Sequence, residues 1–218
     1  MAIALVSSSV GKGTANPAVV AYPASIAAGD LILLTLFAQG SISPNPPSGF
    51  TLVGAGTSVA GIDMYFCWKS AAGTESGTNL SVPFSGANNW MFVISRITGG
   101  TPFTAGSFKN YSTTSSGSLG SNIAAPNQGA VGAGEMAWAA AGAYNGTNAT
   151  ESGSGSGWTF RNVQNQGSPN ETSFTAESTT ATGAATFNFG ANYAGRIAGS
   201  FIIQEVTASV GYPLLMAM

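Results

Sequence analysis

The amino-acid sequence predicts an all-β protein, a jelly-roll-like antiparallel β-sandwich built from two pseudo-repeats. Short apolar segments rich in β-branched and aromatic residues alternate with clusters of Gly, Pro, Asn and Ser, a pattern typical of strands joined by turns. The same order of segments recurs about 105 to 109 positions later in the 218-residue chain. A chain of this length fits one large β domain.

The segment 29–39, GDLILLTLFAQ, predicts the central strand of a sheet. A Gly-Asp turn opens the segment, and Thr35 is the only polar residue between that turn and Ala38. An apolar run without alternation is typical of a strand that is buried on both faces.

Six shorter segments of the first half also predict strands. They are 3–6, 19–22, 49–53, 63–69, 80–84 and 90–97. Within 63–69, Met64, Phe66 and Trp68 alternate with the residues between them, as on the two faces of a strand. Pro83 predicts that its strand is an edge strand or carries a bulge.

The second half repeats this order of segments. Residues 134–144 correspond to the central strand, and 157–160, 173–178, 186–189 and 200–207 correspond to 49–52, 65–70, 80–84 and 93–98. The alanines of EMAWAAAGAY would favour a helix in isolation, but its counterpart in the first half favours a strand. We expect its small side chains to pack closely under another sheet or against a neighbouring subunit.

We expect a single sandwich domain over residues 1–208, with pseudo-repeats at about 1–104 and 105–208 and an apolar C-terminal arm at 209–218. A half of this length and glycine content would bury a marginal core. The segment that joins the halves keeps Phe103, Phe108 and Tyr111, which a free linker would not need. Two arrangements stay open: the copies close one sandwich between them, or each forms its own sheet stack.

Composition argues against nucleic-acid and membrane binding. Charged residues make up 6% of the chain and the net charge is −2, and the basic residues are scattered singly rather than gathered to neutralise phosphates. The apolar runs fall short of the ~20 residues of a membrane-spanning helix. The N-terminal MAIALVSSSV lacks the basic region of a secretory signal, and we expect it to be a strand.

The residue types needed for most catalysis are absent or isolated. The chain has no histidine, which excludes Ser-His-Asp and Cys-His catalysis and the commonest metal ligand. Cys67 is the only cysteine, so we expect a buried, inert thiol and no internal disulfide. Lys12 in Gly11-Lys12-Gly13 does not form a Walker motif, because no Ser or Thr follows the lysine and no Gly stands at the start. The formal dinucleotide-binding match at 132–137 lacks the required strand and helix context. We therefore expect no enzymatic activity, no cofactor and no metal.

Asp30 and Glu135 occupy equivalent positions in the two copies. Such a pair could act as paired acids or as metal ligands. Each also follows a Gly-containing turn, where a carboxylate can accept hydrogen bonds from turn amides. We favour the second interpretation.

The C-terminal arm has no counterpart in the first copy, and its apolar residues are a candidate subunit interface. These residues are Tyr212, Leu214, Leu215, Met216 and Met218. An exposed apolar tail favours aggregation, so we expect the arm to cover its own domain or a neighbouring subunit, with disorder as the third alternative.

Several short motifs resemble a module of tailed-bacteriophage virion proteins. They are the Gly-Asp before the central strand, PPSGFT at 46–51, MYFCWKSA at 64–71 and RITGG at 96–100, followed by Thr-Pro-Phe. In that family, which includes capsid decoration and tail appendage proteins, the motifs belong to β-sandwich domains. Phe50 stands where the family usually has Trp, and Trp158 keeps the Trp in the second copy. The resemblance implies no catalytic residues.

From this resemblance we expect a capsid decoration (cement) protein, made in the host cytoplasm and located on the capsid surface of the virion. The implied partners are further copies of the chain, as a homotrimer, and the major capsid protein. One alternative is a tail fibre or receptor-binding tip, which could contact a surface glycan. Another is a carbohydrate-binding sandwich in which exposed Trp90, Trp158 or Tyr144 would stack on sugars.

Overall fold

A computed structural model describes residues 2–39, 46–57, 61–85, 89–99, 103–144, 152–167 and 170–206, without the side chains of 162–171. The protein is almost entirely β, with 62% of its residues in strands. Within the described ranges, the one helical element is a single 3-10 turn, η1, at Ala105–Ser107.

Two antiparallel five-stranded sheets form the body of the protein. The first has the order β1 (Ala4–Gly13), β7 (Trp90–Thr98), β3 (Leu31–Gln39), β5 (Ile62–Ser70), β4 (Thr51–Thr57). The second has the order β12 (Thr159–Gly167), β13 (Asn170–Ser178), β10 (Glu135–Tyr144), β15 (Gly195–Gln204), β8 (Phe108–Ser116). The two predicted central strands, β3 and β10, each lie in the middle of a sheet.

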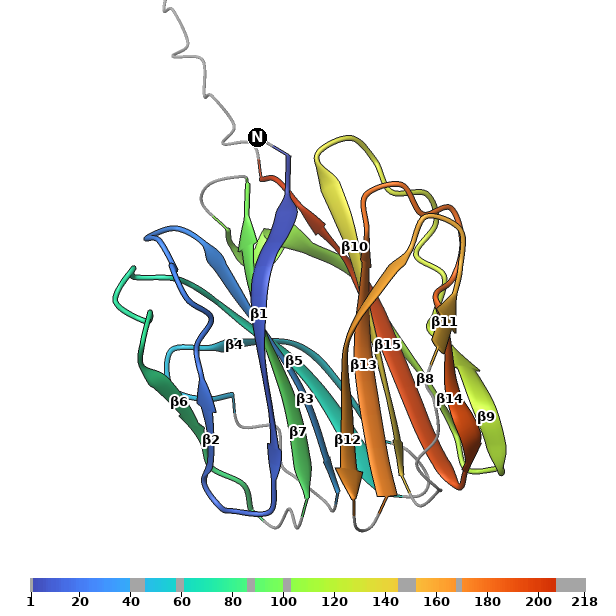
Figure 1. Ribbon diagram of the computed structural model, residues 1–218. Coiled ribbons are helices and arrows are strands. Elements are labelled where there is room, and N and C mark those ends of the chain that lie inside the picture. Colours follow the sequence, from blue (N-terminus) through green and yellow to red (C-terminus); the bar gives the residue numbers. More distant parts are fainter. Residues whose placement is uncertain are drawn as a thin grey trace, which may run out of the picture.

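A smaller sheet covers the outer face of each five-stranded sheet (Figure 1). β2 (Ala18–Ala21) pairs with β6 (Asn79–Val82) over the first sheet. Over the second lie β11 (Ser152–Ser154), β14 (Thr186–Tyr193) and β9 (Gly120–Ala124). The four layers confirm the predicted all-β antiparallel sandwich, while its jelly-roll character stays a prediction.

The strand order of the first five-stranded sheet recurs in the second. Starting from β8, the second sheet reads β8-β15-β10-β13-β12, which matches β1-β7-β3-β5-β4 strand for strand. Among the described residues, no sheet mixes strands from the two halves. Each half therefore forms its own stack, and the stacks share a core between their large sheets.

The two halves face each other with an approximate two-fold relation. β1 contacts β12 and β4 contacts β8, while β7 contacts β13 and β5 contacts β15. Because β1 is equivalent to β8 and β4 to β12, each contact has its counterpart after exchange of the halves. β3 and β10 contact each other at the centre, as two copies would in an isologous dimer.

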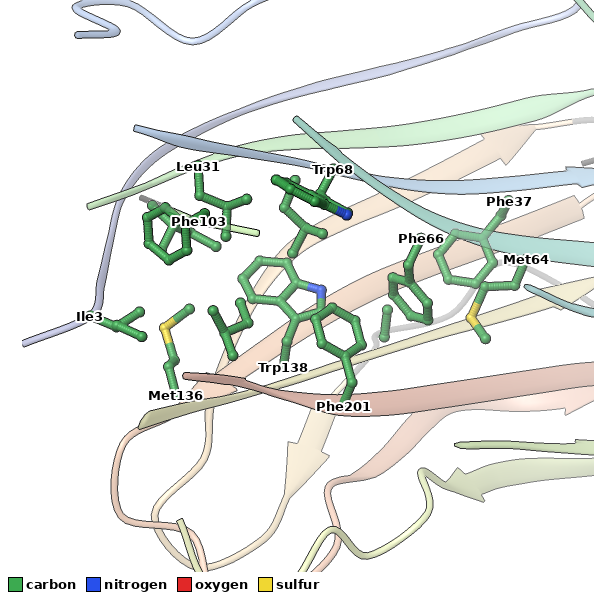
Figure 2. Close-up of a cluster of buried hydrophobic side chains, with 14 of the residues drawn as sticks. Ile3, Leu31, Phe37, Met64, Phe66, Trp68, Phe103, Met136, Trp138 and Phe201 are labelled. Atoms are coloured by element: carbon green, nitrogen blue, oxygen red, sulfur yellow. The ribbon is translucent and has the colours of Figure 1, made fainter. Parts of the chain in front are cut away.

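The core between the large sheets holds large apolar side chains from both halves, among them Phe37, Phe66, Trp68, Trp138 and Phe201 (Figure 2). The Trp138 indole lies in the middle of this core, and its Nε1 donates to Thr35 Oγ1 at 3.3 Å. Phe37 lies against Gly142, since a Cβ at that glycine would come within 2.4 Å of the Phe37 ring. A large side chain of the first half thus packs against a glycine of the second half, across the approximate two-fold axis that relates the halves.

The alanines of β10 pack closely under another sheet, which is the first of the two roles predicted for them. Ala139, Ala141 and Ala143 are buried under the smaller sheet, in a cluster with Phe187 and Phe189 of β14. In the first half the sizes are reversed, with leucines and isoleucine on β3 under Val20, Leu80 and Val82. Small central residues therefore let a cover sheet with large side chains approach.

Two parts of the sequence prediction need correction. The joining segment after residue 104, expected to be a connection, contains β8 and β9, the counterparts of β1 and β2. The strand expected at 3–6 extends to Gly13, because β1 pairs with β7 as far as Gly13, which lies opposite Trp90. β6 ends at Val82, before Pro83, and among the described residues its one partner strand is β2.

Candidate functional site

Asp30 and Glu135 close identical turns. An Asp30 carboxylate oxygen accepts a hydrogen bond from Ala27 N–H at 2.8 Å, and a Glu135 carboxylate oxygen accepts one from Gly132 N–H at 2.8 Å. In both turns the backbone N–H of the acid donates to the carbonyl three residues earlier, at 3.2 Å. The interpretation as turn-closing acids is confirmed.

Each of these two acids also binds a cation, from a different strand in each half. Arg96 of β7 donates its Nε–H to Asp30 Oδ2 at 2.6 Å. Lys109 of β8 forms an ion pair with Glu135. Burial alone would raise the pKa of Glu135, but Lys109 and the Gly132 N–H outweigh this effect, so the pKa is lowered. In the part of the chain that the structure describes, no three acidic or cysteine side chains gather as a metal site would require.

Lys69 and Glu75 form a third internal ion pair, at 2.8 Å. The ammonium group of Lys69 also lies over the rings of Tyr22 and Phe50, at 5.2 and 5.5 Å from their centroids. Burial alone would raise the pKa of Glu75, but hydrogen bonds from Lys69 and from Ala72 N–H outweigh it and hold the pKa at about 2. This cluster fixes the loop after β5.

Cys67 is buried on the outer face of β5, 3% exposed, within the core under β2 and β6. Burial raises the pKa of its thiol to about 12. The thiolate needed for nucleophilic or metal chemistry is therefore suppressed, as the sequence predicted.

The aromatic residues expected as sugar-stacking platforms belong to the cores. Trp90 is only 5% exposed, stacks on Phe92 at 4.9 Å and donates its Nε1–H to Ala15 O at 2.8 Å. The expectation of an exposed Trp90 is thus wrong, because its indole packs inside the first stack. Trp158 and Tyr144 are partly buried, and their polar atoms bond to Gly183 O and Gln39 Nε2.

A hollow of about 340 Å³ lies where the N-terminal end of β1 meets the second half. Its apolar side comes from the start of the chain and from β10. Its polar side comes from the turn before β12, from β12 and β13, and from the turn after β13. The lining residues are Ile3, Ala4, Leu5, Met136, Gly157, Thr159, Glu177, Ser178, Thr179 and Thr180.

Glu177 is the charged residue of this hollow. It is 8% exposed, and its Oε1 accepts from Arg161 Nε at 2.5 Å. Its other carboxylate oxygen, Oε2, is buried and accepts no hydrogen bond. Burial raises the pKa of Glu177 against the opposing effect of Arg161. Sequence reasoning did not single out this hollow, because its residues come from four separate segments.

The candidate interface residues of the C-terminal arm, Tyr212, Leu214, Leu215, Met216 and Met218, lie outside the described residues. Within the described ranges there is no helix with the length and apolarity to cross a membrane.

Fold and site together define an all-β, duplicated sandwich in which four acids, Asp30, Glu75, Glu135 and Glu177, are held in internal ion pairs. When compared with known proteins, the chain matches no family model, no curated protein and no solved structure. The likeness to phage virion proteins therefore rests on the sequence motifs alone.

Proposed function

We propose that this protein is a structural component of a tailed-phage virion, a capsid decoration protein that works by binding and assembly rather than by catalysis. The observation that carries the proposal is the internal neutralisation of its charges. Four ion pairs contain eight of the chain's fourteen charged residues. They are Asp30–Arg96, Lys69–Glu75, Lys109–Glu135 and Arg161–Glu177.

The remaining arginine, Arg196, is also bound internally. It is 8% exposed, and its guanidinium donates to the carbonyl oxygens of Ser118, at 2.7 Å, and of Asn122. A surface of hydroxyl and amide groups can pack closely against identical neighbours without leaving buried charges unpartnered. This property suits a subunit that covers a lattice.

The edges of the sheets favour association through side chains rather than through added strands. Every edge strand of the two large sheets has an irregular register with its neighbour, while all four interior pairings are regular. The irregularities lie at Leu5/Ser7, Leu52/Gly54, Arg161/Gln164 and Ser200/Ile202. Bulges at sheet edges hinder edge-to-edge pairing, so a controlled oligomer such as the expected trimer would use its faces or the C-terminal arm.

Imaging of the labelled protein on virions tests the location directly. A decoration protein gives density over the head, in contact with the major capsid protein, whereas density only at the tail would contradict this proposal. A tail location would favour the alternative of a fibre or receptor-binding tip.

A further inference from the structure

We propose that the hollow between β1 and β13 is a binding site for a primary alkylammonium group, with Glu177 as its anionic partner. This inference does not depend on the proposed function. Its first support is a difference between the two halves at positions that the duplicated fold makes equivalent.

The register of the sheets identifies those positions. Trp68 on β5 lies opposite Leu33, and Glu177 on β13 lies opposite Trp138. Because β3 is equivalent to β10, Glu177 occupies in the second half the place of Trp68 in the first. Ile97 of β7 lies opposite Leu31, and Ile203 of β15 lies opposite Met136, so these two isoleucines are equivalent as well. Leu5, which lies opposite Ile97, therefore corresponds to Phe108, which lies opposite Ile203.

Around Trp68, aromatic rings fill the core between the two large sheets. The Trp68 ring lies 5.1 Å from the Phe108 ring, and Phe108 lies 5.8 Å from Phe201. At the equivalent place across the approximate axis, Glu177 and Leu5 replace Trp68 and Phe108, and the hollow opens between them. Ser95 stands at the position equivalent to Phe201, since Ser95 lies two residues before Ile97 and Phe201 two residues before Ile203. The buried Oγ of Ser95 has no hydrogen-bond partner.

The second support is the unpartnered oxygen of Glu177. A carboxylate can accept about four hydrogen bonds, and leaving a buried acceptor unpaired is unfavourable. Oε1 is bound by Arg161, while Oε2 has no partner. A donor that enters the hollow and reaches Oε2 through a small side-chain adjustment would satisfy it.

The lining selects the chemistry of that donor. Ile3, Leu5 and Met136 provide an apolar wall for an aliphatic stem, while Thr159 and Thr180 add hydroxyl groups beside the carboxylate. An ammonium group has three donors and no acceptor, and its bond to a carboxylate is stronger than a neutral one. The guanidinium of Arg161 is half exposed, so water screens its repulsion of a second cation.

The test is a titration of the whole chain with n-butylammonium chloride at pH 8, followed by NMR, with sodium chloride and 1-pentanol as references. We expect saturable binding with a dissociation constant on the order of millimolar, with shifts at Leu5, Met136 and Thr159. Neither reference should produce them. Absence of saturable shifts in the wild-type protein would overturn the inference.

Variants then distinguish binding of butylammonium in the hollow from a general effect of the amine on the protein. Glu177→Gln should weaken binding by about tenfold or more, because the charge-assisted bond is lost. Leu5→Phe should abolish binding by restoring the ring of the equivalent position, with Glu177 intact. Arg161→Gln should tighten binding, because the carboxylate loses its competing cation.

Glu75→Gln is the matched control, since it removes another buried, ion-paired carboxylate and should leave butylammonium binding unchanged. Equal weakening by Glu75→Gln and Glu177→Gln would overturn the inference. Nα-acetyl-lysine N-methylamide distinguishes the source of the ammonium group. Equal or tighter binding of this probe indicates a lysine side chain of another protein, and binding of butylammonium alone indicates a free amine.

Discussion

Gln39 and Tyr144 end the central strands of the two halves, at equivalent positions, and they bond to each other. Gln39 Nε2 donates to the Tyr144 hydroxyl oxygen at 2.6 Å, and Gln39 Oε1 accepts from Asn89 Nδ2 at 2.8 Å. This link joins the stacks at one end of the core, beyond the contact of Phe37 with Gly142.

Removal of this hydroxyl gives the first prediction. Tyr144→Phe should lower the free energy of unfolding by about 1 kcal/mol, because Gln39 loses its acceptor. Tyr111→Phe is the matched control, since the Tyr111 hydroxyl is buried without a hydrogen-bond partner. Its removal should be neutral or stabilising. Urea unfolding of both variants measures the difference, and equal costs would contradict the role of the Gln39–Tyr144 bond.

The close contact at Gly142 gives the second prediction. Gly142→Ala should destabilise the protein by about 1–3 kcal/mol, because its Cβ would lie 2.4 Å from Cδ1 of Phe37. The cost should shrink in a Phe37→Leu background. Gly183→Ala, at a glycine with no atom within 4 Å of the added Cβ, should change stability by less than about 0.5 kcal/mol. Thermal unfolding of the four variants tests whether the cost arises from the ring.

The lowered pKa of Glu75 gives the third prediction, on pH. Its carboxyl has a pKa of about 2 in the folded protein against 4.5 as the reference value, which corresponds to on the order of 3 kcal/mol of stability. A lowered carboxyl pKa stabilises the folded state above the unfolded pKa. The contribution is therefore complete above about pH 4.5 and is lost as the pH falls toward 2.

Glu75→Gln should remove the contribution of the Glu75 carboxylate to the free energy of unfolding, together with the pH dependence of that contribution. The difference in unfolding free energy between wild type and variant should be constant from pH 6 to 8 and shrink steadily below pH 4.5. A difference that stays constant down to pH 2.5 would show that the ionised Glu75–Lys69 pair is not its cause.

The sequence was sufficient for features that rest on local chemistry. The apolar run of β3 and the Gly-Asp turn before it identify a buried strand and a turn-closing acid without knowledge of the partners. The sequence did not predict β8 and β9, because strands at the edge of a large sheet or in a smaller outer sheet are half exposed. Their Ser-, Thr- and Asn-rich sequences therefore resemble loops.

The hollow could not be found from the sequence for a different reason. Leu5 and Glu177 are far apart in the chain, and their equivalence to Phe108 and Trp68 depends on the register of six strand pairs. The repeat aligned by its motifs matches segments only to within a few residues. A shift of one residue in a strand moves a side chain to the opposite face, so the structure was needed to place Glu177 in the shared core.

The C-terminal arm gives the last prediction. Deletion of residues 211–218 should leave the sandwich folded and weaken self-association or binding to capsids, because the deleted segment contains Tyr212, Leu214, Leu215, Met216 and Met218. Burial of apolar surface contributes about 25 cal/mol per Å², so loss of these side chains at an interface should be visible as a lower sedimentation coefficient at equal concentration.

A full-length variant with these five residues replaced by serine is the matched control, since it keeps the length of the arm and removes its apolar surface. We expect it to behave as the truncated protein does. If the serine variant associates normally while the truncation does not, the backbone of the arm and not its side chains makes the contact. If the truncated protein still decorates purified capsids at full occupancy, the arm is not the interface, and the faces of the sandwich must supply it.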